Sequence, residues 1–252
     1  MIVAEALLPR RQREIDLLLR WPGNFGVAML STFLVRLIIP ATAAGVATAT
    51  EAAGFGLFNN LALPLPLTIA LTVVFLDLII YWQHRLFHAV PLLWRIHRMH
   101  HTDIEFDATT ALRFHPFEIV LSMLLKLGVI VLLGAPAVAV IVFEIVLNGS
   151  AIFNHSNVRL PDKLDRALRA VIVTPDMHRV HHSTLPQETN SNFGFFLSCW
   201  DRWFGSYIAQ PQLGHEHMRI GLAEFRDRTT ARLDQMLINP FVDADQVKTD
   251  QA

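Results

Sequence analysis

Histidines at helical spacing are the residues of this chain most suited to chemistry. Eight of its twelve histidines fall into three short runs with the spacings HxxxH, HxxHH and HxxHH, at 84–88, 97–101 and 178–182. Residues three and four apart share a face of a helix, so each run presents several imidazoles in one direction. Neutral imidazole is a ligand for iron, zinc, copper and nickel. The spacing therefore predicts a metal centre.

The number of histidines indicates more than one metal ion. A single ion takes about three to six ligands, so eight or nine histidines favour a dinuclear site. A hydrolytic zinc site typically uses three protein ligands, and the HExxH signature of zinc proteases does not occur in this sequence. Soluble di-iron bundles use Glu-x-x-His pairs, which the three runs do not match.

The remainder of the sequence is hydrophobic enough for a membrane. Of the 252 residues, 52% are hydrophobic and 17% are charged, and the net charge is -1. These values predict one membrane domain and argue against a nucleic-acid partner. Cys199 is the single cysteine, which excludes an intrachain disulfide and a thiolate metal cluster.

Four apolar segments are long enough to cross a bilayer as helices. Two precede the histidines, at about 24–50 and 61–82, and two lie between the second and third runs, at about 117–133 and 135–153. The turn at Gly134, Ala135 and Pro136 is so short that we expect the last two helices to be antiparallel neighbours. The expected fold is an all-α membrane protein with about four transmembrane helices in two hairpins and a helical cytosolic cap that carries the dimetal site.

Basic residues before the first span set the expected topology. Arg10, Arg11, Arg13 and Arg20 place the N-terminus on the cytoplasmic side by the positive-inside rule. Two crossings return the chain to that side at the first histidine run, and two more return it before the third. We therefore expect a multi-pass integral membrane protein with both termini and the histidine site on the cytoplasmic face.

Short helices are expected to position the histidines. His84 and His88 would lie at the cytosolic end of the second span. Pro91 suits the first turn of a helix that carries the second run, and Thr174 and Pro175 suit the N-cap and first turn of a helix that carries the third.

The three runs and five further motifs together resemble the fatty acid hydroxylase/sterol desaturase superfamily of integral-membrane di-iron oxygenases. The further motifs are RFHP at 113–116, NHSN at 154–157, TPDMH at 174–178, NFG at 192–194 and WDRWFG at 200–205. The resemblance extends over about 68–207, and three ordered histidine runs make it specific. We expect this stretch to be the catalytic core of a single domain spanning 1–252.

The resemblance implies a di-iron centre that uses O2 and two electrons to hydroxylate or desaturate a C–H bond of a sterol, fatty acyl or related lipid. Carried over residue by residue, the metal ligands are His84, His88, His97, His100, His101, His155, His178, His181 and His182. Many members carry a further histidine where this chain has Ala151, so the ligand set departs from the pattern there. No catalytic residue beyond the metal ligands is implied.

The resemblance also implies partners. The lipid substrate would come from the bilayer, and we expect electrons from a separate cytochrome b5-like or ferredoxin-like protein. The oligomeric state stays open. The rival interpretation is a membrane protein that binds or transports zinc or nickel without redox chemistry. The position of the histidines at helix ends, away from the bilayer midplane, argues against transport.

Several residues allow two interpretations. Asp77 either orients a ligand imidazole or pairs with Arg36 or a backbone group. His155 is either a ligand or a helix cap, and His115 is expected to be structural. The helix at about 160–173 lies either on the membrane surface or against the cap. The aromatic cluster at 193–204 either borders a lipid entrance or packs in the core.

The segment from about 214 to 252 is expected to be a polar cytosolic tail that frays after Val242. His215 and His217 are expected on its surface.

Overall fold

The computed structural model describes residues 1–243, and within them the chain is helical. Helices make up 65% of the structure and no strand forms in the described part, which confirms the predicted all-α class. Four helical segments are long and apolar enough to cross a membrane: Leu17–Ala52, Leu65–Ala89, Pro116–Leu133 and Ala137–Asn154. The shortest of these would extend roughly 27 Å at 1.5 Å per residue, close to the thickness of the hydrocarbon core.

The first of these segments is two helices. α2 (Leu17–Ile38) and α3 (Ala43–Ala52) are separated by a short break at Pro40. Proline disfavours helical geometry in the residue before it, and Ile39 accordingly leaves the helix with φ -126° and ψ 82°. The Thr42 hydroxyl then accepts a hydrogen bond from the Gly45 amide and starts α3. The span predicted for 24–50 is therefore confirmed as a candidate membrane segment, and the structure divides it into two helices.

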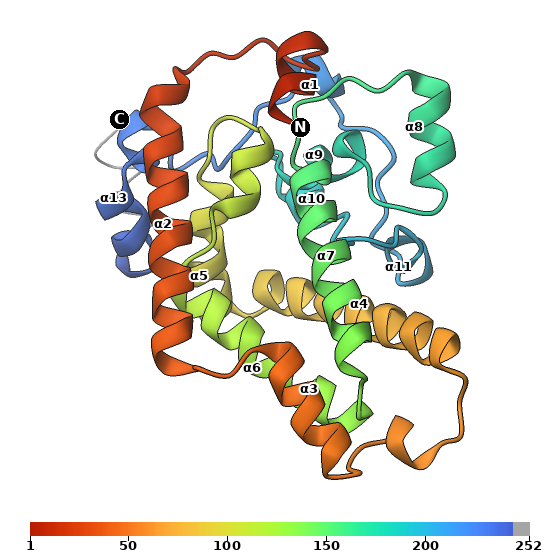
Figure 1. Ribbon diagram of the computed structural model, residues 1–252. Coiled ribbons are helices and arrows are strands. Elements are labelled where there is room, and N and C mark those ends of the chain that lie inside the picture. Colours follow the sequence, from red (N-terminus) through yellow and green to blue (C-terminus); the bar gives the residue numbers. More distant parts are fainter. Residues whose placement is uncertain (244–252) are drawn as a thin grey trace.

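α4 (Leu65–Ala89), α6 (Pro116–Leu133) and α7 (Ala137–Asn154) confirm the other predicted spans to within a few residues, except that α4 continues for two further turns beyond Trp82. Gly134 ends α6 in the left-handed region at φ 61°, which a glycine adopts without strain. α6 and α7 meet at this turn but then diverge (Figure 1): α6 packs along α2 and α7 along α4, while α3 packs against both. The two helices form the expected hairpin and are linked by an ion pair of 2.7 Å between Lys126 and Glu144, but they do not pack closely along their length.

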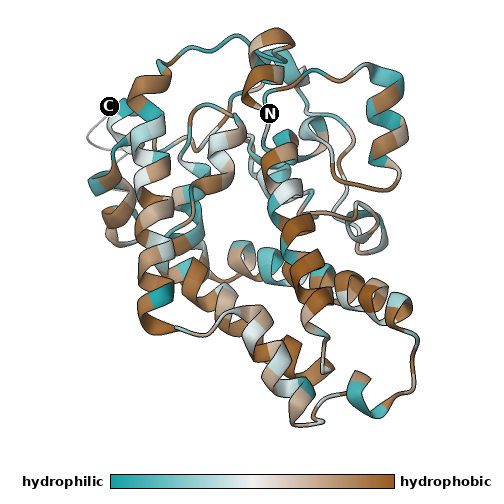
Figure 2. Ribbon diagram, in the orientation of Figure 1, coloured by the Kyte–Doolittle hydropathy of each residue, from teal (hydrophilic) through white to brown (hydrophobic). Residues whose placement is uncertain are grey.

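A hydrophobic core forms where the membrane helices meet. Ala47 of α3, Leu76 of α4, Ile130 of α6 and Phe143 of α7 are all buried in it. Figure 2 shows that hydrophobic residues dominate these helices, whereas hydrophilic residues are concentrated towards the other end of the molecule. Large apolar side chains of the spans also face outward, as expected where lipid replaces water.

The other end of the molecule is a cap of short helices. They are α1 (Ile2–Leu7), α5 (Pro91–His101), α8 (Asp162–Arg169), α9 (Pro175–His181), α10 (Pro186–Thr189), α11 (Cys199–Trp203), α12 (Gly214–His217) and α13 (Leu233–Ile238), with the 3-10 turns η2 (Ala108–Leu112), η3 (Arg228–Ala231) and η4 (Asn239–Phe241); a further turn, η1 (Phe58–Asn60), precedes α4. Arg20 of α2 ties the cap to the first span by buried ion pairs of 2.7 Å to Asp103 and to Asp107.

The segment after Gly214 packs against the rest of the chain. α13 lies against α2, and Met236 is buried in contact with Val27 and Met99. His217 is exposed as expected, but His215 is 4% exposed and its Nε2 lies 3.6 Å from Asp176, so the predicted surface position of His215 is wrong. The fraying predicted after Val242 concerns residues 244–252, which lie outside the described range.

The predicted surface helix at 160–173 is shorter than expected. α8 turns Asp165 and Arg169 inward, where they pair at 2.6 Å, and Arg169 also donates to the carbonyl of Ala209. Leu164 and Val171 are exposed. The helix therefore packs against the cap by its charged residues and leaves apolar ones on the outer surface.

Candidate metal centre

The three histidine runs lie on the elements that their spacing predicts. His84 and His88 occupy the last turns of α4, and Pro91 begins α5, which carries the second run. Pro175 begins α9, and the Thr174 hydroxyl accepts a hydrogen bond from the Met177 amide as its N-cap. The third run follows within two turns.

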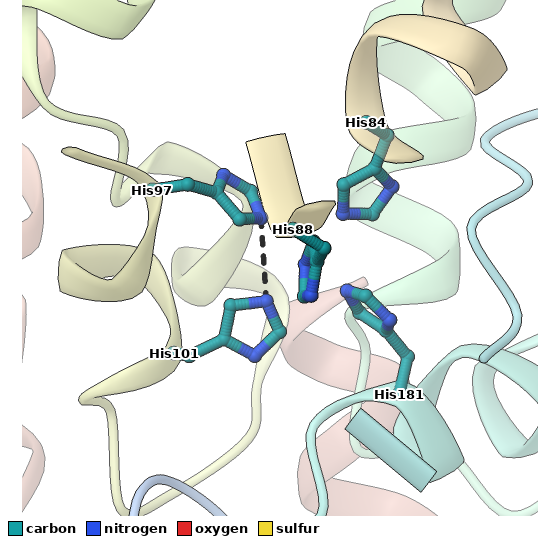
Figure 3. A group of neighbouring side chains, drawn as sticks. All are labelled: His84, His88, His97, His101 and His181. Carbon is teal, nitrogen blue, oxygen red and sulfur yellow. Dashed lines mark hydrogen bonds between the residues drawn. The ribbon is translucent and has the colours of Figure 1, made fainter. Parts of the chain in front are cut away.

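The nine predicted ligands come together in two groups. His84, His88, His97, His101 and His181 form the first group (Figure 3), and His100, His155, His178 and His182 form the second. In each group one ring nitrogen of every histidine lies within 4.8 Å of the others. All nine are buried except His88, which is partly exposed. The structure thus assembles the predicted residues, and ligation by them stays a prediction.

Hydrogen bonds on the outer side of the rings fix which nitrogen faces inward. Four Nδ1 atoms contact backbone carbonyl oxygens: His84 that of Phe193 at 2.9 Å, His100 that of Arg113 at 3.2 Å, His155 that of Ala151 at 2.8 Å and His181 that of Ser191 at 2.7 Å. A carbonyl oxygen only accepts, so each of these Nδ1 atoms carries the proton and each Nε2 atom is left as a lone pair.

The lone pairs of His100 and His155 face each other, and Nε2 of His178 lies beside them. The Nε2 atom of His155 lies 3.2 Å from Nε2 of His100 and 3.1 Å from Nε2 of His178. The Nε2 atoms of His84 and His181 are buried without a hydrogen-bond partner in the described structure. Converging lone pairs repel, and buried acceptors without donors are costly. A cation between the rings would remove the repulsion and give each buried nitrogen a partner. The donor set therefore fits metal ions.

Burial keeps these imidazoles neutral. Removal from water lowers the pKa of His155 to about 4 and, together with neighbouring imidazoles, lowers the pKa values of His100, His101 and His181 well below the usual 6.5. A metal binds the unprotonated ring. The site is therefore ready for metal ions at neutral pH.

Glu118 is a residue of the site that the sequence reasoning missed. It lies in the first turn of α6, and its Oε1 lies 2.7 Å from Nδ1 of His97. A carboxylate in this position fixes the tautomer and the orientation of a ligand imidazole. The available signal was an acidic residue at the start of an apolar helix, three positions after His115.

Asp77 and Asp201 support the loop that follows α10. Asp77 accepts hydrogen bonds from the backbone amides of Phe196 and Leu197 and from the Trp200 indole. Asp201 accepts from the amides of Phe193 and Gly194. Of the two interpretations of Asp77, partnership with backbone groups is confirmed. Asp77 thus supports the same loop that supplies the Phe193 carbonyl to His84.

Other predicted roles are resolved by their contacts. His115 caps α6 by accepting from the Phe117 amide, and its other ring nitrogen contacts the Leu237 carbonyl, so its structural role is confirmed.

Within the aromatic cluster, Phe193 and Trp200 are buried, whereas Trp203 is 70% exposed.

A cavity of about 310 Å³ lies beside the first group. Its wall includes His84 and His97, together with residues of α2, α6 and α7. Phe195 from the aromatic cluster and Ala151 from α7 also line it. The position at which the resemblance implies a further histidine is thus part of the cavity wall in this chain.

Comparison with known proteins places these features in a family. The fatty acid hydroxylase model matches residues 69–206. The chain is 30% identical over 149 residues to an ornithine lipid hydroxylase, OlsE, of Rhizobium tropici, which covers 59% of this chain and 44% of that protein. It is 27% identical over 200 residues to an alkylglycerol monooxygenase of Xenopus tropicalis, covering 76% of this chain and 44% of that protein.

The human alkylglycerol monooxygenase is 26% identical over 137 residues, covering 52% of this chain and 28% of that protein. The chain thus spans less than half the length of these curated relatives. No solved structure matches it. Because the family model covers more than half of the sequence, including all three histidine runs, the chain belongs to the fatty acid hydroxylase family.

Proposed function

We propose that this chain is a membrane-bound di-iron oxygenase that hydroxylates a C–H bond of a lipid. The observation that carries the proposal is the pair of adjacent histidine groups with converging Nε2 atoms. All-imidazole sites suit several metals. Similarity to an ornithine lipid hydroxylase and to alkylglycerol monooxygenases favours iron and hydroxylation over zinc or nickel binding and over desaturation.

The protein supplies binding, orientation and a dry environment. The nine histidines would hold the metal ions, and bound iron would supply the oxidising power that lets one oxygen atom of O2 enter the lipid while the other leaves as water, with two electrons and two protons consumed. Glu118 would hold His97 in its orientation, and four backbone carbonyls, one of them in α7, would hold four further rings. The cavity beside His84 and His97 would bring the C–H bond to the site.

The proposed topology places the cap, both termini and the histidines in the cytoplasm. The arginines that precede α2 lie on the same side of the spans as the cap, and this side is opposite the turn at Gly134 (Figure 1). In this topology a lipid enters from the bilayer, whereas electrons arrive from a separate cytochrome b5-like or ferredoxin-like protein on the cytoplasmic side. Residues 68–207 would form the catalytic core of the single membrane domain.

Metal analysis tests the proposal. Protein purified anaerobically in detergent after iron-replete expression is expected to hold about two irons per chain, and His97→Ala or His181→Ala is expected to lower this number. His217→Ala, at an exposed histidine outside both groups, is the matched control and is expected to retain the iron. Stoichiometric zinc without any O2-dependent product would favour the rival metal-binding function.

A further inference from the structure

The cavity beside the histidines has several polar residues in its wall. Most of its lining is apolar, but six residues contribute polar groups: Ser31, Thr32, Gln83, Glu118, Ser122 and Asn148. A ligand in this cavity would sit against His84 and His97. Of these residues, Glu118 contacts the proposed ligand His97 and so places a polar group close to the proposed metal ions.

Glu118 has one carboxylate oxygen left for a ligand. Its Oε1 accepts from His97, whereas Oε2 is buried without a hydrogen-bond partner in the described structure. The residue is 5% exposed, so bulk water does not solvate this oxygen freely. A buried carboxylate oxygen without a donor is costly, and a ligand that donates a hydrogen bond removes that cost.

Gln83 adds a second polar point on the same wall. Its Oε1 is also buried without a partner. A carboxamide can turn to present either its oxygen or its NH2 group, so Gln83 can accept a hydrogen bond from the ligand or donate one to it. A carboxylate only accepts. A ligand that pairs with Glu118 must therefore carry a hydrogen-bond donor.

We propose that the cavity binds the polar end of the lipid substrate, and that Oε2 of Glu118 accepts a hydrogen bond from a hydroxyl or amide N–H group of that lipid. The inference rests on the proposed oxygenase function and narrows its substrate class. The oxidised carbon would lie within a few bonds of the donor group, near the polar end of the lipid and away from the end of its chain. A lipid without a donor leaves Oε2 unpaired and is rejected.

The size of the cavity agrees with this assignment. Ligand pockets range over roughly 300–1,000 Å³, and the volume of about 310 Å³ is at the lower limit. The cavity therefore holds a polar group and the first carbons of a lipid. Asn148, which lines the cavity, is exposed on α7, so the remaining chain can extend past it into the bilayer.

Competition for one photoreactive probe tests the assignment. The full chain in detergent is labelled with a photoreactive analogue of 1-O-hexadecylglycerol, and labelling is competed with unlabelled 1-O-hexadecylglycerol or with its di-O-methyl ether, which has no donor. In the wild type, the free-hydroxyl lipid is expected to reduce labelling by half at a concentration at least about tenfold lower than the di-O-methyl ether. This factor is the one expected for one hydrogen bond to a charged group.

Two variants assign the preference to residues. Glu118→Gln keeps an oxygen for His97 but places an NH2 group at the Oε2 position, so the preference is expected to fall below about threefold while the metal content is retained. Gln83→Leu, which removes an amide whose Oε1 has no hydrogen-bond partner in the described structure, is expected to reduce the preference as well. Gln187→Leu, at an exposed glutamine outside the cavity, is the matched control and is expected to keep it.

The outcomes separate this inference from the oxygenase proposal. Equal competition by the two lipids in the wild type would overturn the inference, and so would an unchanged preference in Glu118→Gln. If Glu118→Gln loses metal, the lipid preference of Gln83→Leu is used instead, and an unchanged preference in that variant would overturn the inference. A clear preference for the free-hydroxyl lipid in a protein that holds no iron and forms no oxidised product would support the binding site and contradict the oxygenase.

Discussion

The carboxylate of Glu118 lies 2.7 Å from Nδ1 of His97 and joins the start of a membrane-spanning helix to the second histidine run. The two residues are 21 positions apart and lie on α6 and α5, which pack against each other. Through this contact, the position of α6 in the membrane and the orientation of a proposed metal ligand are linked.

Removal of the Glu118 carboxylate is expected to weaken metal binding. Partners that orient a ligand imidazole typically contribute about 10- to 100-fold to metal affinity, so Glu118→Ala should lose metal to a chelator at a correspondingly lower chelator concentration. Glu118→Gln keeps an acceptor for His97 and should retain most of the affinity. Glu51→Gln, at an exposed position on α3, serves as the control. Equal metal retention in Glu118→Ala and the wild type would contradict the role of the carboxylate.

Asp77→Ala is expected to destabilise the loop at 193–204. The substitution leaves the amides of Phe196 and Leu197 and the Trp200 indole without their acceptor. Each lost hydrogen bond to a charged group costs roughly 1.5–3 kcal/mol, so a lower thermal unfolding temperature is expected. Asp77→Asn, which retains one carbonyl oxygen, should lose less. An unchanged unfolding temperature in Asp77→Ala would show that the loop does not depend on this carboxylate.

The ion pair between Lys126 and Glu144 bridges the diverging helices α6 and α7. Its nitrogen and oxygen are 2.7 Å apart, and Lys126 is largely buried whereas Glu144 is about one-third exposed. Lys126→Met leaves a carboxylate unpaired within the membrane span and is expected to destabilise the protein. Adding Glu144→Gln should recover stability, with a coupling energy of about 1–2 kcal/mol in a double-mutant cycle. Strictly additive effects on thermal unfolding would contradict an energetically coupled pair.

His215 should make the metal-free protein sensitive to acid. Burial lowers the pKa of His215 to about 3 from a usual value of 6.5; Asp176 opposes this shift, and nearby arginines add to it. The unfolded chain therefore binds a proton that the folded chain excludes. The contribution of His215 to stability is complete above about pH 6.5 and is lost progressively as the pH falls towards 3.

His215→Gln tests this dependence. Thermal unfolding of the metal-free wild type and of the variant is compared between pH 7 and pH 4. The wild type is expected to lose more stability over this range because only the wild type has to exclude a proton from position 215. Parallel pH profiles would contradict a depressed pKa at His215.

Local patterns in the sequence predict much of this molecule. The histidine runs, Pro91 and Pro175 act within one or two helical turns, and the apolar segments are defined by length and composition. For that reason the helices and the nine clustered histidines were predictable. The proline in the first span was visible in the sequence, but its effect was underestimated.

Contacts between distant segments account for what the sequence did not reveal. The bond between Glu118 and His97 requires α5 to pack on α6, and the burial of His215 requires the C-terminal segment to fold back beside Asp176. The divergence of α6 and α7 goes with their packing on different helices, α2 and α4. No periodicity within a single segment encodes these three relationships.

Labelling with ¹⁸O2 tests the proposed oxygenase most directly. Cells that express the native chain or a His100→Ala, His101→Ala variant are grown under ¹⁸O2, and their lipids are compared by mass spectrometry. The account predicts a lipid that carries one ¹⁸O atom in a new hydroxyl group with the native chain and is missing with the variant. Lipid profiles that do not differ between the two, or a hydroxyl oxygen that comes from water, would contradict it.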